Sequence, residues 1–177
     1  MFWAKVMRYL VIFQCNGGGY KVRIIVFSDT HGRIDRCIEV LEAVADFDMI
    51  LHAGDCVADA QKLAQQFPGT RVYFVRGNND FGQNVSDVEI VHAEDKRLLL
   101  THGHIQRVKR GLEDISAIRD RYQNPFDLIV FGHTHQSFDG YVCGQHLLNP
   151  GTMGYYPYSY GVIEISGSKL KTALIQP

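Results

Sequence analysis

The chain has 177 residues, which is enough to bury one full hydrophobic core, so a single globular domain is expected. Apolar residues make up 46% of it and charged residues 21%, and the formal net charge is -1. This near-neutral charge disfavours binding to long nucleic acid, because such proteins carry a basic surface or tract.

The four cysteines are scattered along the chain and form no CxxC pair; they are Cys15, Cys37, Cys56 and Cys143. This pattern is typical of reduced thiols in a cytoplasmic protein. The apolar segment Phe2 to Phe13 is interrupted by Lys5 and Arg8, and it falls well short of the roughly 20 residues of a spanning helix. No signal-peptide cleavage site follows it. A cytoplasmic protein without a membrane segment is therefore expected.

The first 21 residues differ in sequence pattern from the rest of the chain. A breaker, Asn16 to Gly19, stands just before the first core strand. Residues 1–21 are therefore predicted to be an extension outside the fold, with Val22 as the candidate first residue of the native protein. Residues 22–177 are predicted to form the domain. The alternative is an added edge strand or helix built from Lys5 to Phe13.

The first half of the remaining chain alternates strands with helices. Val22 to Phe27 is an apolar run rich in β-branched residues, which is typical of a strand buried on both faces. Met49 to Leu51 and Val72 to Val75 are further short strands. Helical spacing of apolar residues covers Arg33 to Ala45 and Val57 to Phe67. This β-α-β-α-β order predicts parallel strands with right-handed crossovers.

The second half is richer in strands. A hairpin is predicted from Val88 to His92 and Leu98 to Thr101, and a helix from Leu112 to Tyr122. The remaining predicted strands are Leu128 to Phe131, Ser137 to Val142, His146 to Leu148, Tyr160 to Ile165 and Leu170 to Ile175. Two sheets that face each other, with helices outside, would account for this arrangement.

Polar side chains follow five of these strands: Asp29 with His31, Asp55, Asn78, His102, and His133 with His135. Ligands of open α/β sheets bind just beyond the carboxyl ends of strands. Three oxygens and four imidazoles suit Mn²⁺, Fe²⁺ or Zn²⁺ better than Ca²⁺. Seven ligands are too many for one ion with an open position, and they suit two ions that share a carboxylate.

Each of these signals is weak when taken alone. Asp29 and His31 are equally typical of a turn before a helix, and a lone histidine at a strand end is more often a core or rim residue. His52, His92 and His146 are assigned to that ordinary role. The ordered series, with each member at a strand end, is what favours a metal site.

The motifs SDTHG, GDC, GNND, THGH and GHTH, in this order, resemble those of the calcineurin-like metallophosphoesterases. The length and the NPGT loop resemble the compact prokaryotic phosphodiesterase branch of that superfamily. The resemblance runs from Val22 nearly to the C-terminus. It implies an α/β fold, a four-layer α/β/β/α sandwich with two mixed sheets and a dinuclear metal site at strand ends.

The resemblance also implies a set of metal ligands. By motif position Asp29, His31 and His135 would hold one ion, Asn78, His102 and His133 would hold the other, and Asp55 would bridge them. The implied cofactors are two divalent metal ions, Mn²⁺ first, with Fe²⁺, Zn²⁺ and Ni²⁺ as the other candidates.

One position departs from the superfamily pattern. Many members read GNH[DE], whereas this chain has Asn79, an amide that donates a hydrogen bond but is no acid near neutral pH. The compact branch commonly lacks the histidine as well. Phosphodiesters or activated esters are therefore expected in preference to monoesters. Asp55 and Asn79 are predicted to be catalytic, Asn79, Arg76 and His104 to contact substrate, and Asp80 to be structural.

The predicted function is hydrolysis of a small phosphodiester by in-line attack of a metal-bound hydroxide. The alternative is a non-catalytic protein-binding scaffold, because a eukaryotic protein-sorting subunit resembles this fold and has lost some ligands. All seven ligand positions are filled here, which favours the enzyme. A homo-oligomer is compatible with the sequence. The loop with Tyr155, Tyr156, Tyr158 and Tyr160 is predicted to frame the pocket, to form an oligomer contact or to pack in the second sheet.

Overall fold

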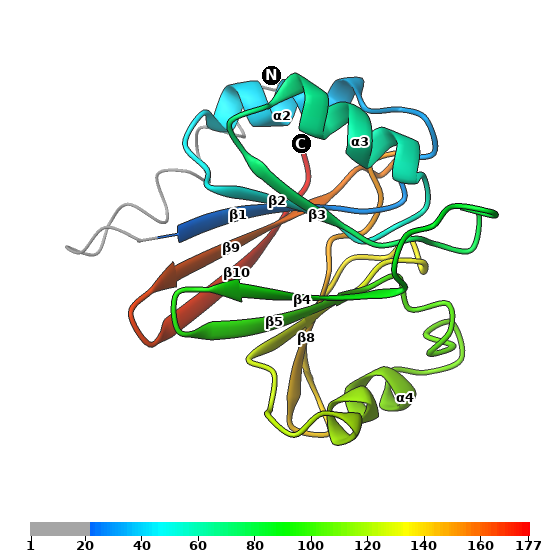
Figure 1. The fold of residues 1–177 in the computed structure, drawn as a ribbon, viewed down its shortest axis with the longest axis vertical. Coiled ribbons are helices and arrows are strands. Elements are labelled where there is room, and N and C mark those ends of the chain that lie inside the picture. Colours follow the sequence, from blue (N-terminus) through cyan, green and yellow to red (C-terminus); the bar gives the residue numbers. More distant parts are fainter. Residues whose placement is uncertain (1–21) are drawn as a thin grey trace.

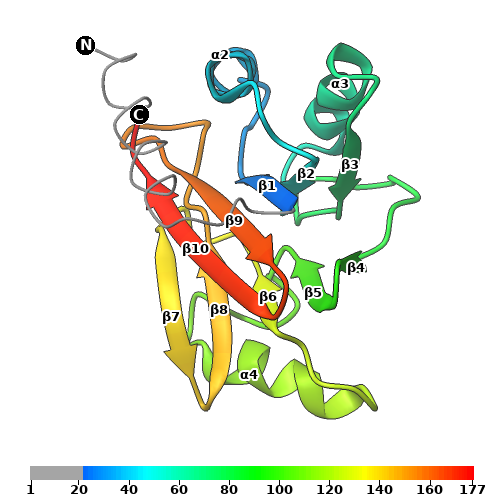
Figure 2. The same ribbon diagram turned by 90° about the vertical axis from the view of Figure 1, so that its left-hand side faces the viewer.

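The structure, a computed structural model, describes residues 22–177, so the predicted extension over residues 1–21 lies outside the described residues. Two five-stranded sheets face each other, with helices on their outer sides (Figures 1 and 2). The layer order is α/β/β/α, as expected. Among residues 22–177, no helix has the length and apolar character of a membrane span. The three cysteines in this part of the chain form no disulfide.

The first sheet has the strand order β10-β9-β1-β2-β3. Its strands are β1 (Val22–Phe27), β2 (Met49–His52), β3 (Arg71–Phe74), β9 (Tyr160–Ser166) and β10 (Lys169–Ile175). As predicted, β1 pairs with β2 and β2 with β3 in parallel. In addition, β9 pairs antiparallel with β1. The crossovers are α2 (Asp35–Val44) and α3 (Val57–Gln66), and both cover the outer face of this sheet (Figure 1).

The second sheet has the strand order β4-β5-β6-β8-β7. Its strands are β4 (Val88–Ala93), β5 (Lys96–Thr101), β6 (Leu128–Val130), β7 (Phe138–Val142) and β8 (Gln145–Asn149). The predicted hairpin is β4 and β5, whereas β5, β6 and β8 run parallel to one another. Both sheets are therefore mixed.

The helix predicted from Leu112 to Tyr122 is only partly α-helical. It consists of α4 (Glu113–Ser116) followed by the 3₁₀ helix η1 (Ala117–Arg121). Its inward apolar residues, Leu112, Ile115 and Ile118, recur every third position. That spacing keeps them on one face of the segment, in α-helical and in 3₁₀ geometry alike.

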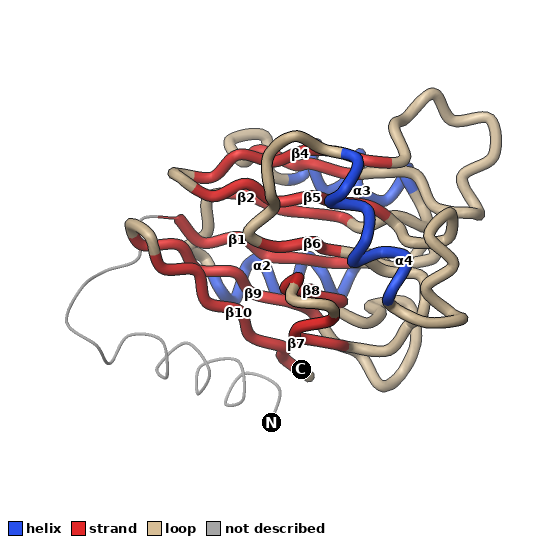
Figure 3. The backbone as a smooth tube through the Cα atoms, turned by 90° about the horizontal axis from the view of Figure 1, so that it is seen from below, coloured by secondary structure: helices blue, strands red, loops and turns tan. Residues whose placement is uncertain are grey.

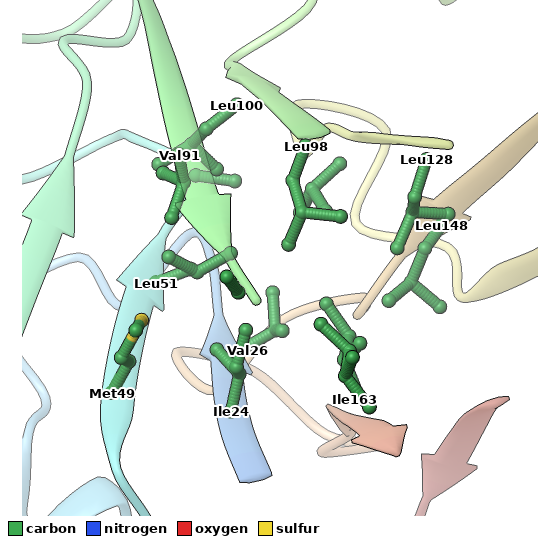
Figure 4. Close-up of a cluster of buried hydrophobic side chains, with 14 of the residues drawn as sticks. Ile24, Val26, Met49, Leu51, Val91, Leu98, Leu100, Leu128, Leu148 and Ile163 are labelled. Atoms are coloured by element: carbon green, nitrogen blue, oxygen red, sulfur yellow. The ribbon is translucent and has the colours of Figure 1, made fainter. Parts of the chain in front are cut away.

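The largest of the three clusters of buried apolar side chains among the described residues lies between the two sheets. Because side chains alternate along a strand, β1 sends Ile24 and Val26 toward the second sheet and Ile25 and Phe27 toward α2 and α3. Figure 4 shows the inner layer, in which side chains of both sheets meet. Each fully buried side chain of this kind contributes about 1.5–3 kcal/mol. This double burial explains why every residue of the strand except Arg23 is apolar.

The polar loops that follow the carboxyl ends of five strands meet at one side of the two sheets. These strands are β1, β2, β3, β5 and β6. Short hairpin turns lie at one end of the strands and the longer loops gather at the other (Figure 3). The residues that follow β1 and β6 are in direct contact, since the backbone N–H of His133 donates to Asp29 Oδ2 over 3.0 Å. The fold thus places the five polar strand ends at one edge.

Candidate metal centre

The first group of ligand atoms comes from three strand ends and from both sheets. One ligand atom each of Asp29, His31, Asp55 and His135 lies within 4.8 Å of all the others. His135 Nε2 is 3.1 Å from Asp29 Oδ1, and it is 3.3 Å from His31 Nε2. The chain therefore brings together two carboxylates and two imidazoles that were predicted from separate motifs.

The second group centres on His102, which is fully buried. Its Nδ1 donates to the Ala53 carbonyl over 2.7 Å, so the neutral tautomer of this ring is the one that leaves Nε2 bare on its other side. That Nε2 lies 3.2 Å from Asn78 Oδ1 and 3.5 Å from Asp55 Oδ1. In that tautomer three acceptor atoms converge, which is the arrangement that a cation stabilises. The ring of His133 packs edge-on against His102, with centroids 4.9 Å apart.

The Asp29 carboxylate also fits a metal ligand. Its Oδ2 accepts hydrogen bonds from Ser28 Oγ and from the His133 backbone N–H. Its Oδ1 is buried, and its contact with His135 Nε2 at 3.1 Å is not aligned as a hydrogen bond. A buried carboxylate oxygen without a donor is costly unless a cation or another partner neutralises it. Together with the imidazoles, this oxygen suits a borderline first-row ion.

Asp55 belongs to both groups. It is 1% exposed and lies between the first-group histidines and His102. Asn79 orients its carboxylate, because the Asn79 backbone N–H donates to Oδ1 and the side-chain Nδ2 donates to Oδ2. A carboxylate held in this position can face two cations at once.

The electrostatics of the site favour the protonation states that metal ligands need at Asp29 and His133 and oppose them at His135. Burial lowers the pKa of His133 to about 4, so this ring is neutral at pH 7. Burial alone would raise the pKa of Asp29, but the contacts with His135 and Ser28, together with the nearby positive charge, outweigh it and the net direction is downward. The same contact raises the pKa of His135. A metal ion would therefore compete with a proton at His135.

The backbone of the site is strained. Ten non-glycine residues of the described chain have positive φ, and five of them are predicted ligands: Asp29, His31, Asp55, His133 and His135. The backbone of a non-glycine residue rarely adopts this left-handed region, and each such residue costs on the order of 1–3 kcal/mol of conformational strain. Such outliers gather at functional sites, so their concentration here supports the assignment of the site.

The other predicted site residues lie around the ligands. The ring of His104 is 5.4 Å from that of His102, and its buried Nδ1 has no hydrogen-bond partner. The Arg76 guanidinium forms a two-pronged ion pair with Asp87, at 2.6 and 2.9 Å. Asp80 has the structural role predicted for it, since its carboxylate accepts from the backbone N–H groups of Val57 and Gly77.

A buried polar chain beneath the site was not predicted from the sequence. Asp59 Oδ2 accepts from Thr30 Oγ1 over 2.8 Å and from the Gly32 N–H over 2.7 Å. Because the Thr30 proton goes to Asp59, the Thr30 oxygen accepts from His52 Nε2, 3.1 Å away. These bonds hold the loop that carries Asp29 and His31. The available signal was Asp59, a carboxylate on the apolar face of a predicted helix.

His52 should make stability fall in mild acid. Burial lowers its pKa to about 4, so the unfolded chain takes up a proton near pH 6.5 while the folded chain does not. The contribution of His52 to the free energy of unfolding is therefore fully present above pH 6.5 and is lost between pH 6.5 and 4. His52→Gln keeps a donor for Thr30 but does not titrate. We expect its loss in unfolding free energy between pH 6.5 and 5 to be smaller than that of wild type by about 2 kcal/mol. Denaturant titrations in chelator would measure it, and equal losses would contradict it.

The NPGT loop supports the site in a way that the sequence did not reveal. Asn149 Nδ2 donates to the Gly132 carbonyl, next to His133 and His135. Thr152 Oγ1 donates to the Asp29 carbonyl over 2.8 Å. A loop after β8 thus braces the strand ends of β1 and β6. Nothing in its local sequence specifies those distant partners.

Comparisons with known proteins agree with this architecture. The family model of the calcineurin-like phosphoesterase superfamily domain matches residues 22–168. A "probable metallophosphoesterase" of Mycoplasma genitalium is 30% identical over 135 residues, which cover 75% of this chain and 77% of the relative. A phosphodiesterase of Methanocaldococcus jannaschii is 26% identical over 152 residues, covering 73% and 83%.

A solved structure shares the fold at lower identity. Vps29 of Entamoeba histolytica, in complex with Zn²⁺, superposes with a TM-score of 0.68 at 19% identity, covering 87% of this chain and 98% of that one.

Proposed function

This chain belongs to the calcineurin-like phosphoesterase superfamily, and we propose that within it the protein is a phosphodiesterase that works with two divalent metal ions. The observation that carries the proposal is the position of Asp55, between one group with Asp29, His31 and His135 and a second group at His102. A carboxylate shared by two sets of ligands is what a two-ion site requires.

We assign one ion to Asp29, His31 and His135 and the other to Asn78, His102 and His133, with Asp55 common to both. Manganese is the first candidate metal. When bound, two such ions would lower the pKa of a coordinated water and neutralise the charge of the phosphoryl oxygens. The protein contributes the position and protonation of each ligand. It holds His102 as the Nδ1–H tautomer and keeps His133 neutral.

Asn79 favours diesters over monoesters. One Nδ2 hydrogen is used by Asp55, and the other is available to a phosphoryl oxygen. No acid is present at this position to protonate a poor leaving group, so activated esters and diesters should be preferred. His104 is a further candidate for substrate contact, because it lies beside two predicted ligands. Arg76 stands at the same rim with its charge matched by Asp87.

Removal of metal tests the proposal. We expect the purified protein to hydrolyse bis(p-nitrophenyl) phosphate with added Mn²⁺, to lose this activity in EDTA and to regain it when Mn²⁺ is restored. It should hydrolyse glycerol phosphate, a monoester with a poor leaving group, far more slowly, because Asn79 cannot supply a proton to the departing alkoxide. Elemental analysis should find close to two ions per chain. Undiminished turnover in EDTA would refute the metal-dependent mechanism.

The same assay separates the enzyme from a binding scaffold. A chain that folds and binds metal but turns over neither ester would favour the scaffold. Metal-dependent turnover would exclude a purely non-catalytic role.

A further inference from the structure

The tyrosine loop divides into a core part and a part at the metal centre. Tyr160 is fully buried and packs against Phe27, so it belongs to the core. Tyr155 instead lies against two predicted ligands: its ring stacks on His135, with centroids 5.9 Å apart and planes 17° apart, and it is 5.3 Å from the ring of His31. It remains 46% exposed, and the adjoining Tyr156 is 86% exposed. An accessible aromatic surface thus borders the ligands of the first ion.

The backbone holds this surface in place. The Gly154 N–H donates to the Asp29 carbonyl over 3.1 Å, and the Gly154 carbonyl accepts from Arg33 Nη1 over 3.2 Å. The loop approaches so closely that a Cβ at Gly154 would lie 2.7 Å from the Asp29 carbonyl oxygen. Tyr155 is therefore tied to the same backbone that carries Asp29, and it needs little further ordering to receive a ligand.

A cation accompanies the ring. The guanidinium carbon of Arg33 is 5.4 Å from the centroid of Tyr155. Arg33 is exposed, and no ion pair joins it to a carboxylate of the described residues. Aromatic rings and guanidinium planes are the two protein surfaces on which nucleobases stack. The positive charge also favours a ligand that carries phosphate.

We propose that Tyr155 and Arg33 form a subsite for the nucleoside group that stays on phosphorus when a nucleotide diester is hydrolysed. The inference rests on the proposed function, since it names the substrate class of the same site. The substrate is small, because the neutral chain offers no basic track for a long strand. The subsite accounts for an exposed aromatic ring beside a polar metal centre.

Two esters with the same leaving group test this subsite. Thymidine 5′-(p-nitrophenyl phosphate) and methyl p-nitrophenyl phosphate differ only in the group that stays on phosphorus. We expect wild type with Mn²⁺ to prefer the thymidine ester about ten-fold in kcat/KM, which is the size of one base–aromatic stack. Tyr155→Leu should remove most of that preference and Tyr155→Phe should keep it. Using the ratio cancels any effect of these variants on the metal ligands.

A matched control lies on β7. Tyr141 is 74% exposed and stacks on His146 at 4.7 Å, so it resembles Tyr155 but sits away from the candidate ligands. Tyr141→Leu should leave the ratio unchanged. A ratio near one in wild type, or a ratio unaltered by Tyr155→Leu, would overturn the subsite even when both esters are hydrolysed.

A binding measurement separates the subsite from the proposed function. We expect thymidine 5′-phosphate to bind wild type about ten-fold more tightly than methyl phosphate in calorimetry with Mn²⁺, and Tyr155→Leu to reduce this difference. If neither ester is hydrolysed but the difference in binding is found, the proposed function fails and the subsite stands. Equal binding of the two phosphates refutes the subsite.

Discussion

Replacing Asp55 with asparagine is expected to lower kcat/KM for bis(p-nitrophenyl) phosphate on the order of 10³-fold or more, which corresponds to about 4 kcal/mol of transition-state stabilisation. The substitution keeps the size of the side chain but removes the charge that both ligand groups share. It also turns an acceptor of two Asn79 hydrogen bonds into a group that accepts with one atom only. We expect elemental analysis to find fewer bound ions, with the fold retained.

The control for this variant is another aspartate that faces a histidine. Asp139 accepts from His146 over 2.8 Å on the second sheet, and it contacts none of the candidate ligands. Asp139→Asn should retain wild-type turnover and metal content. Asp55→Asn that kept turnover within about three-fold of wild type at full metal loading would overturn the central position given to Asp55.

Replacing Gly132 with alanine is expected to damage stability and activity together. A Cβ there would lie 2.0 Å from Ser28 Oγ and 2.8 Å from Asp29 Oδ2. The backbone cannot move away easily, because its N–H donates to the His102 carbonyl and its carbonyl accepts from Asn149. Overpacking of this kind costs about 1–3 kcal/mol, or roughly 3–10 °C in Tm for a domain of this size. Displacement of Asp29 should lower kcat/KM on the order of 100-fold.

Thermal denaturation and initial rates on one preparation would measure both effects. Gly69→Ala is the matched control, because a Cβ at Gly69 would meet no atom within 4 Å and its backbone is not in the left-handed region. We expect that variant to stay within about 0.5 kcal/mol of wild type. A Gly132→Ala protein with wild-type Tm and turnover would show that the strand ends are looser than their hydrogen bonds indicate.

Much of the fold follows from local sequence patterns. The run from Val22 to Phe27 predicted a strand buried on both faces, and β1 is buried at every position. Helical spacing located α2 and α3 to within two residues at each end. These predictions worked because alternation and helical periodicity are properties of a single segment. The pairing of β1 with β9 was not predicted, because partners about 140 residues apart leave no local signal.

The candidate site was predictable for a related reason. Each ligand motif stands at the end of an apolar strand, so sequence order and parallel topology together place the motifs at one edge. The supporting residues are different. Thr30, Asp59 and Asn149 act through hydrogen bonds to distant loops, and no local pattern specifies a partner for them. The left-handed backbone of Asp55 and His133 was equally hidden, since neither is glycine.

The seven predicted ligands are divided between the sheets. Four follow strands of the first sheet, namely Asp29, His31, Asp55 and Asn78, and three follow strands of the second, namely His102, His133 and His135. Ions held by both sets would join two layers that otherwise meet through the apolar core. By mass action a ligand at 100 times its Kd adds about 2.7 kcal/mol to the stability of the folded state. The free concentration of metal in the cell would then affect the stability of the folded chain as well as its activity.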